Sequence, residues 1–82
     1  MRMKHQLVGY DSKTELLSVA VTIPAERFPM AAEIAHVPPD DTEAVGCYPL
    51  DSEQARLIAK LTGAHSINSG LMYFMEPVPL SH

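Results

Sequence analysis

Apolar and polar side chains alternate most clearly between residues 15 and 23. Every second position from Leu17 to Ile23 is apolar and mostly β-branched, and the positions between them are small or polar. A period of two is typical of a half-buried strand, and Pro24 ends it. Residues 4–10 predict a partner strand, joined through the polar turn of residues 11–14. The N-terminal part of the chain is therefore expected to form an antiparallel hairpin.

The apolar period lengthens after this hairpin. Met30, Ile34 and Val37 stand at i, i+4 and i+7 with alanines between them. This spacing predicts a helix that has Pro29 in its first turn and ends before Pro38. Residues 38–46 are expected to form an acidic loop, and residues 47–49 to lead into the next element.

A second helix is predicted over residues 52–62 by signals at both of its ends. Asp51 is an N-cap residue, and Gln54 stands at the position that completes a capping box. Gly63 supplies a left-handed residue at the C-terminal end.

Residues 71–76 predict a final strand, closed by Pro77. Leu71, Tyr73 and Met75 fall on one of its faces, and Met72 and Phe74 on the other. The elements follow in the order ββααβ. We expect a single α+β domain over residues 1–82, in which two helices pack on one face of a three-stranded, mainly antiparallel sheet.

Composition narrows the classes of function. The chain has 82 residues and a formal net charge of −4, which opposes binding to the phosphates of nucleic acid. Its only cysteine is Cys47, so a disulfide within one chain is excluded, and a reducing compartment is expected. The sequence shows no signal-peptide pattern and no apolar run long enough to cross a membrane. These features predict a cytoplasmic protein without a membrane or nucleic-acid partner.

Several short motifs resemble a group of small uncharacterised bacterial proteins that share a domain of unknown function. They are Tyr10-Asp11, Asp40-Asp41, Cys47-Tyr48-Pro49, Gln54-Ala55 and Tyr73-Phe74-Met75-Glu76. The resemblance implies a compact α+β fold and brings no known activity. The alanine-rich first helix and the Pro-Val-Pro segment near residue 78 depart from that pattern.

Two chemical interpretations compete with a purely structural role for the polar residues. Cys47 can act as a nucleophile if a base lowers the pKa of its thiol, and Asp40 with Asp41 can serve acid/base chemistry if the two are unequally buried. Imidazole and thiolate also suit a zinc site, but no pair among these side chains has the short spacing of zinc motifs. The candidate ligands are Cys47, His5, His36 and His65. We expect neither a metal nor another cofactor.

The absence of a chemical motif favours a non-catalytic protein that binds another protein in a regulatory or neutralising role. The small enzyme and the His/Cys metal-binding module are the alternatives. A one-signed acidic loop and aromatic side chains are features of docking surfaces. The candidate partner-binding residues are Asp40, Asp41, Glu43, Tyr48 and Tyr73. Because the final strand is apolar on both faces, we also expect a homodimer formed by contact between open sheet faces.

Overall fold

The computed structural model describes residues 3–41, 44, 46–63 and 67–79. The elements in chain order are β1 (Met3–Asp11), β2 (Leu17–Ile23), the short 3-10 turn η1 (Ala25–Arg27), α1 (Phe28–Ile34), β3 (Tyr48–Leu50), α2 (Ser52–Thr62) and β4 (Leu71–Pro79).

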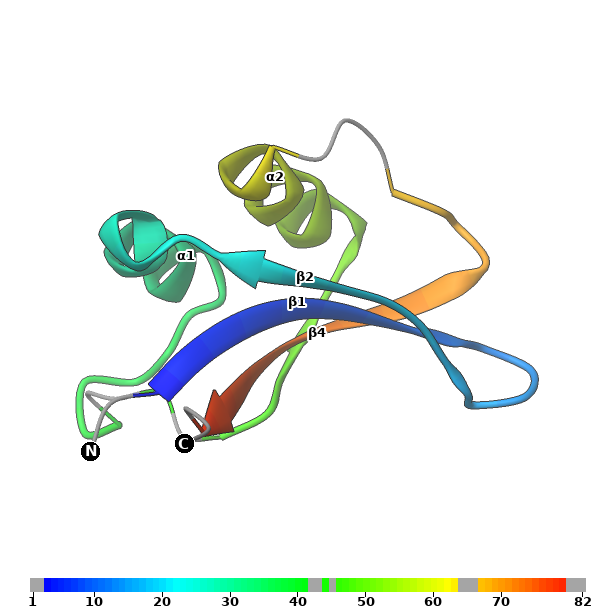
Figure 1. Cartoon of the computed structure of the whole chain (residues 1–82), viewed down its shortest axis with the longest axis horizontal. Coiled ribbons are helices and arrows are strands. Elements are labelled where there is room, and N and C mark those ends of the chain that lie inside the picture. The colour runs from blue at the N-terminus through cyan, green and yellow to red at the C-terminus, as the bar shows by residue number, and fades with distance from the viewer. Residues whose placement is uncertain (1–2, 42–43, 45, 64–66, 80–82) are drawn as a thin grey trace.

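The strands form one antiparallel sheet in the order β2-β1-β4-β3. Both helices lie on the same face of this sheet (Figure 1). The chain is thus an α+β domain with the predicted layering, because each helix has one apolar side that must be buried against the sheet.

The prediction of three strands was wrong, since β3 adds a fourth and changes the order to ββαβαβ. This strand has only three residues, with Pro49 at its centre. Proline removes a backbone donor, so a short segment around it is a poor strand candidate by sequence. At the edge of the sheet its missing N–H is tolerated, and Pro49 pairs with Phe74 of β4.

The last strand is also longer than predicted, because β4 continues through Pro77 to Pro79. Pro77 pairs with His5 and Pro79 with Met3 on the β1 side. On its other side, and among the residues that the structure describes, β4 is paired with β3 only from Tyr73 to Met75. The two prolines therefore lie where β4 is an edge, and they leave that edge without two backbone donors.

A bulge in the β1–β2 pairing changes the face on which Leu17 lies. Gly9 pairs with Val19, but the next residue, Tyr10, pairs with Leu17, so that Ser18 is skipped. An extra residue shifts the alternation of side chains by one position. Leu17 therefore leaves the face of Val19 and is 56% exposed. The prediction that Leu17 shares one face of the strand with Val19, Val21 and Ile23 was wrong for this reason.

The second helix and both of its signals are confirmed. The Asp51 carboxylate accepts the N–H of Gln54 at 2.8 Å, and the Gln54 side-chain oxygen accepts the N–H of Asp51 at 2.9 Å. Gly63 ends the helix in the left-handed region with φ 88°. The Gln54 side-chain amide also donates to the Ile34 carbonyl at 2.8 Å, which ties the start of α2 to the end of α1.

The first helix is shorter than predicted, because His36 adopts the left-handed conformation with φ 60°. The N–H of Val37 donates to the Ala32 carbonyl and that of His36 to the Glu33 carbonyl. These two bonds are those of a Schellman motif, in which glycine usually occupies the left-handed position. A histidine there gives no sequence signal for the end of a helix.

The core lies between the helices and one face of the sheet. Ile58 of α2 and Met75 of β4 are its largest fully buried side chains. Gly9 permits close packing here, because a Cβ atom at this position would lie 2.8 Å from Val19 and 3.0 Å from the ring of Tyr73. Within the described part of the chain, no helix has the length and apolar character needed to span a bilayer.

The capping box generates a prediction about stability. Replacement of an N-cap aspartate by alanine removes the acceptor for the Gln54 N–H, and typically costs about 0.5 to 2 kcal/mol. We expect Asp51→Ala to lower the free energy of unfolding by that amount in urea titrations followed by circular dichroism. Asp40→Ala removes the same charge from an exposed loop residue, so it serves as the control. Equal midpoints for the two variants would show that the cap contributes nothing.

Candidate functional site

The face of the sheet opposite the helices is covered by no helix or loop of the described residues (Figure 1). The strand register arranges its side chains in four rows across the strands. The first row is Leu17, Tyr10 and Met72; the second is Ala20, Val8, Phe74 and Pro49; the third is Thr22, Gln6 and Glu76; the fourth is Lys4 and Val78. The face is therefore apolar at one end and polar at the other. We refer to these residues, together with Cys47, as the open face.

Val8 lies at the centre of the open face and is only 2% exposed. It does not belong to the cluster of buried residues under the helices. Its direct neighbours across the strands are Ala20 and Phe74. Side chains of the open face therefore cover Val8 themselves and form a small second apolar cluster.

Tyr10 fixes one side of this second cluster. Its ring packs edge-on against that of Phe74, with centroids 5.8 Å apart and an interplanar angle of 73°. Its hydroxyl donates to the Glu76 carboxylate, at 3.1 Å from Oε2 and 3.2 Å from Oε1. This hydrogen bond and the negative charge of Glu76 raise the pKa of Tyr10. The phenol therefore stays protonated and remains a donor at neutral pH.

Cys47 makes the other contact to Glu76. Its Sγ donates to Oε2 at 3.2 Å. Desolvation, then the hydrogen bond to Glu76 and the carboxylate charge, raise the pKa of the Cys47 thiol to about 11. A nucleophilic cysteine needs a lowered pKa and a neighbouring base or cation, whereas Cys47 has an anion beside it. The arrangement suits a hydrogen-bond donor rather than a nucleophile.

The acidic loop is organised by a contact between Asp41 and Tyr48. The Tyr48 hydroxyl donates to Oδ2 of Asp41, which also accepts the N–H of Gly46 at 3.3 Å. The hydrogen bond to this carboxylate is the largest cause that raises the pKa of Tyr48 to about 12. Asp41 therefore helps to shape the loop that leads into β3. Asp40 is exposed, and Glu43 lies outside the described residues.

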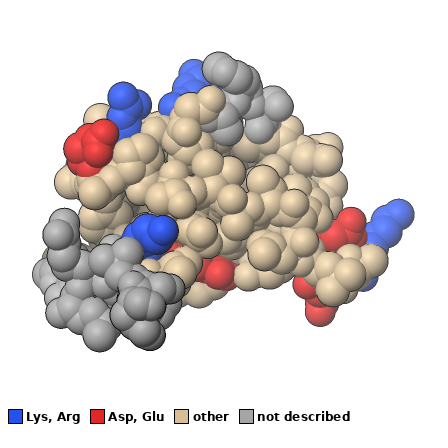
Figure 2. All heavy atoms as spheres, in the orientation of Figure 1, with Lys and Arg blue, Asp and Glu red and all other residues tan. Residues whose placement is uncertain are grey.

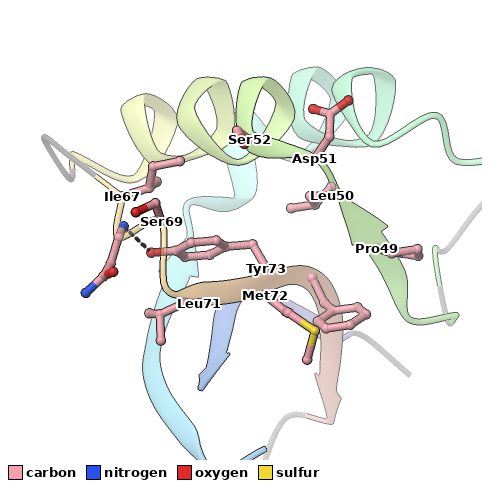
Figure 3. A pocket seen from close by; sticks show the side chains of 11 residues that line it. Pro49, Leu50, Asp51, Ser52, Ile67, Ser69, Leu71, Met72 and Tyr73 are labelled. Carbon is pink, nitrogen blue, oxygen red and sulfur yellow. Dashed lines mark hydrogen bonds between the residues drawn. The ribbon is translucent and has the colours of Figure 1, made fainter. Parts of the chain in front are cut away.

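Tyr73 points toward the helices and is only 8% exposed. Its hydroxyl accepts the N–H of Asn68 at 2.9 Å, which holds the segment before β4 against the strand (Figure 3). The structure thus gives Tyr73 a place in the core, where its side chain offers little surface to a partner. Its neighbours Met72 and Phe74 lie on the open face instead.

A hollow of about 420 Å³ lies beside this tyrosine, between the β3–α2 junction, the segment before β4 and β4 itself. Figure 3 shows Leu50, Ile67 and Leu71 around it, together with Ser69 and Met72. Asp51 also lines it, but its carboxylate caps α2. The hollow is thus lined mainly by apolar groups and by the hydroxyls of Ser52 and Ser69. These groups can contact a side chain of a partner, but they provide no acid/base pair for catalysis.

The candidate zinc ligands do not converge. His5 is buried on the core face, stacked on Phe28 at 4.2 Å, and its Nε2 donates to the Ala44 carbonyl at 3.2 Å. Cys47 lies on the opposite face, His36 is exposed at the end of α1, and His65 is outside the described residues. Among the residues with a described position, no group of three or more His, Cys, Asp or Glu side chains can hold a metal ion.

Sequence reasoning did not single out Tyr10 and Glu76 as partners, because they are 66 positions apart. Alternation along the last strand already places Glu76 on the face of Met72 and Phe74. Alternation does not give the register of β1 against β4, and it is this register that brings Tyr10 onto the same face as Glu76.

A family model described as "Domain of unknown function (DUF7683)" matches residues 4–76. This match spans most of the chain, which therefore belongs to that family. No curated protein and no solved structure matches the chain significantly.

The environment of Cys47 predicts slow reaction with iodoacetamide. With a pKa of about 11 in place of the ordinary 9.0, the thiolate fraction is small at pH 8 to 9. The reaction should be roughly a hundredfold slower there than for an unperturbed thiol, because only the thiolate is nucleophilic. Its rate should rise steeply with pH up to about 11.

Glu76→Gln removes the negative charge beside the thiol, so it should lower the pKa of Cys47 and speed alkylation at pH 9. Glu33→Gln makes the same change on the exposed surface of α1 and serves as the control. Identical pH profiles for wild type and Glu76→Gln would contradict the assigned contact.

Proposed function

We propose that this member of the DUF7683 family is a non-catalytic protein-binding module that acts in the bacterial cytoplasm, and that it binds its partner through the open face. The partner is a protein, with no nucleic acid, membrane or cofactor involved. A regulatory or neutralising role fits a small domain whose surface is specialised for one contact.

The observation that supports this proposal most strongly is the uncovered sheet with an apolar row at one end. Met72 is 43% exposed and Leu17 is 56% exposed, on either side of Tyr10. Methionine, tyrosine and phenylalanine are enriched at protein interfaces, and exposed apolar patches mark interaction sites. The row is also held rigid, because Tyr10 is fixed by Phe74 and Glu76. A rigid surface loses little conformational entropy on binding.

The residues proposed for catalysis are less well suited to that role. The Cys47 thiol is protonated at neutral pH, since its pKa is raised to about 11. The Asp41 carboxylate is occupied by Tyr48 and Gly46, whereas Asp40 is exposed. These two aspartates therefore do not form a buried pair with a shared proton. Binding remains the function that the geometry supports best.

The acidic loop offers a second, weaker contribution to binding. Asp40 is exposed and carries charge, and it precedes the Asp41–Tyr48 contact. A negative charge of this kind speeds and orients the encounter with a basic partner more than it adds affinity.

The proposal can be tested by affinity capture from a lysate of the native host, with variants of two exposed methionines as baits. Met72→Glu places a charge in the apolar row of the open face. Met30→Glu makes the same change on α1, where Met30 is 54% exposed, and serves as the matched control. We expect a partner that is retained by wild type and by Met30→Glu, and lost with Met72→Glu.

Circular dichroism of both variants establishes that they are folded. A retained protein that binds all three baits equally would place the interaction elsewhere. Absence of any retained protein across several growth conditions would argue against a binding module.

A further inference from the structure

The hollow beside Tyr73 continues the open face around the edge of β4. Pro49, Met72 and Phe74 belong to the open face and also line this hollow. Its mouth lies where β3 ends at Leu50 and the chain turns from the sheet into α2. Among the described residues, no strand pairs with Met72 on that side. A partner that covers the apolar row of the open face therefore reaches the mouth of the hollow.

Most polar groups around the hollow are already engaged within the chain. The Tyr73 hydroxyl accepts the N–H of Asn68 at 2.9 Å, and the Asn68 side-chain oxygen accepts the N–H of Gly70 at 2.8 Å. The Asp51 carboxylate accepts the N–H of Gln54. The aliphatic part of the wall consists of Leu50, Ile67 and Leu71, which are partly buried against the core. An occupant therefore gains most from apolar contact, because a buried charge without a partner is costly.

The walls of the hollow are fixed before any partner binds. The capping box of Asp51 and Gln54 fixes the start of α2, and the Leu71 N–H donates to the Asn68 carbonyl at 3.1 Å. The volume of about 420 Å³ lies within the range of about 300 to 1,000 Å³ that is typical of ligand pockets, so it is ample for an aromatic side chain. Preformed pockets of this kind hold the residues that dominate protein interfaces, among which tryptophan and tyrosine are enriched.

The charge around the hollow is negative. Among the described residues that line it, Asp51 is the only charged one, and it is exposed. Arg56, the first base along α2, is already paired with Glu53. Figure 2 shows one face of the molecule, on which Lys and Arg side chains lie apart from one another and form no continuous patch. A basic residue of a partner therefore meets an acid beside the hollow and no concentration of positive charge.

We infer that the hollow receives an aromatic side chain of the protein partner, a tryptophan or tyrosine, with a lysine or arginine beside it in the partner's sequence. The ring packs against Ile67 and Leu71 over the buried Tyr73, and the basic group lies toward Asp51. This inference rests on the proposed function, because it specifies the chemistry of the partner that covers the open face.

Titration of the isotope-labelled full chain with the peptide N-acetyl-Trp-Arg-amide, followed by NMR, tests the inference. We expect shift changes at Ile67, Ser69 and Leu71, and nuclear Overhauser effects (NOEs) from the indole ring to the methyl groups of Ile67 and Leu71. Ser69 points into the hollow (Figure 3), so Ser69→Phe should fill it and weaken binding about tenfold or more. Ser18→Phe makes the same change on β2, at the other side of the sheet, and serves as the matched control. N-acetyl-Trp-Glu-amide should bind about two- to fivefold more weakly, because an exposed ion pair contributes modestly.

The NOEs are measured on wild type, so they do not depend on the folding of a variant. Their absence at millimolar peptide would overturn the inference, as would equal affinity of wild type and folded Ser69→Phe. Equal binding of the two peptides would overturn the assignment of a basic neighbour.

The capture experiment separates this inference from the proposed function. A partner that is retained by Ser69→Phe and lost with Met72→Glu would overturn the inference and leave the proposed function intact. Light scattering coupled to size-exclusion chromatography examines the other occupant, the second copy that the sequence predicts. A dimer that Met72→Glu dissociates, together with no NOE from the peptide, would assign the open face and the hollow to that second copy and overturn the inference.

Discussion

The pairing of β1 with β4 is the constraint on which the rest of the structure depends. These two strands have nine residues each and are joined along their whole length, from Met3 with Pro79 to Asp11 with Leu71. They form the centre of the sheet, with β2 on one side and β3 on the other. The core residues Leu7, Tyr73 and Met75 and the open-face residues Tyr10, Phe74 and Glu76 all come from this one pair of strands. A single register therefore fixes both the packing under the helices and the surface opposite them.

Local signals in the sequence were sufficient for some elements. The capping box of Asp51 and Gln54 and the left-handed Gly63 lie within one helix, and the structure confirms both. Alternation likewise assigned Tyr73 and Met75 to one face of β4 and Phe74 to the other. In the structure Tyr73 and Met75 lie in the core under the helices, and Phe74 lies on the open face beside Val8.

Elements that depend on distant partners were not predictable in the same way. β3 exists because β4 offers it an edge, since a segment of three residues with Pro49 at its centre is a weak strand candidate by sequence. The Ser18 bulge is a property of the β1–β2 pairing, and only this pairing turns Leu17 outward. The contact of Glu76 with Tyr10 and Cys47 joins three separate segments of chain. Non-local pairing of this kind leaves no trace in a window of neighbouring residues.

The place of β4 in the sheet also bears on how the domain is made. β4 is a central strand, yet it follows every other element along the chain. While the chain emerges from the ribosome, the β1–β2 hairpin and both helices are synthesised before the strand that completes their core. The pairing of β4 with β1 must bring residues 71–79 and 3–11 together, at a cost in chain entropy, before it contributes stabilising contacts. The edge of β1 that β4 covers therefore stays unpaired until β4 has left the exit tunnel, and an unpaired strand edge makes a folding intermediate prone to aggregation.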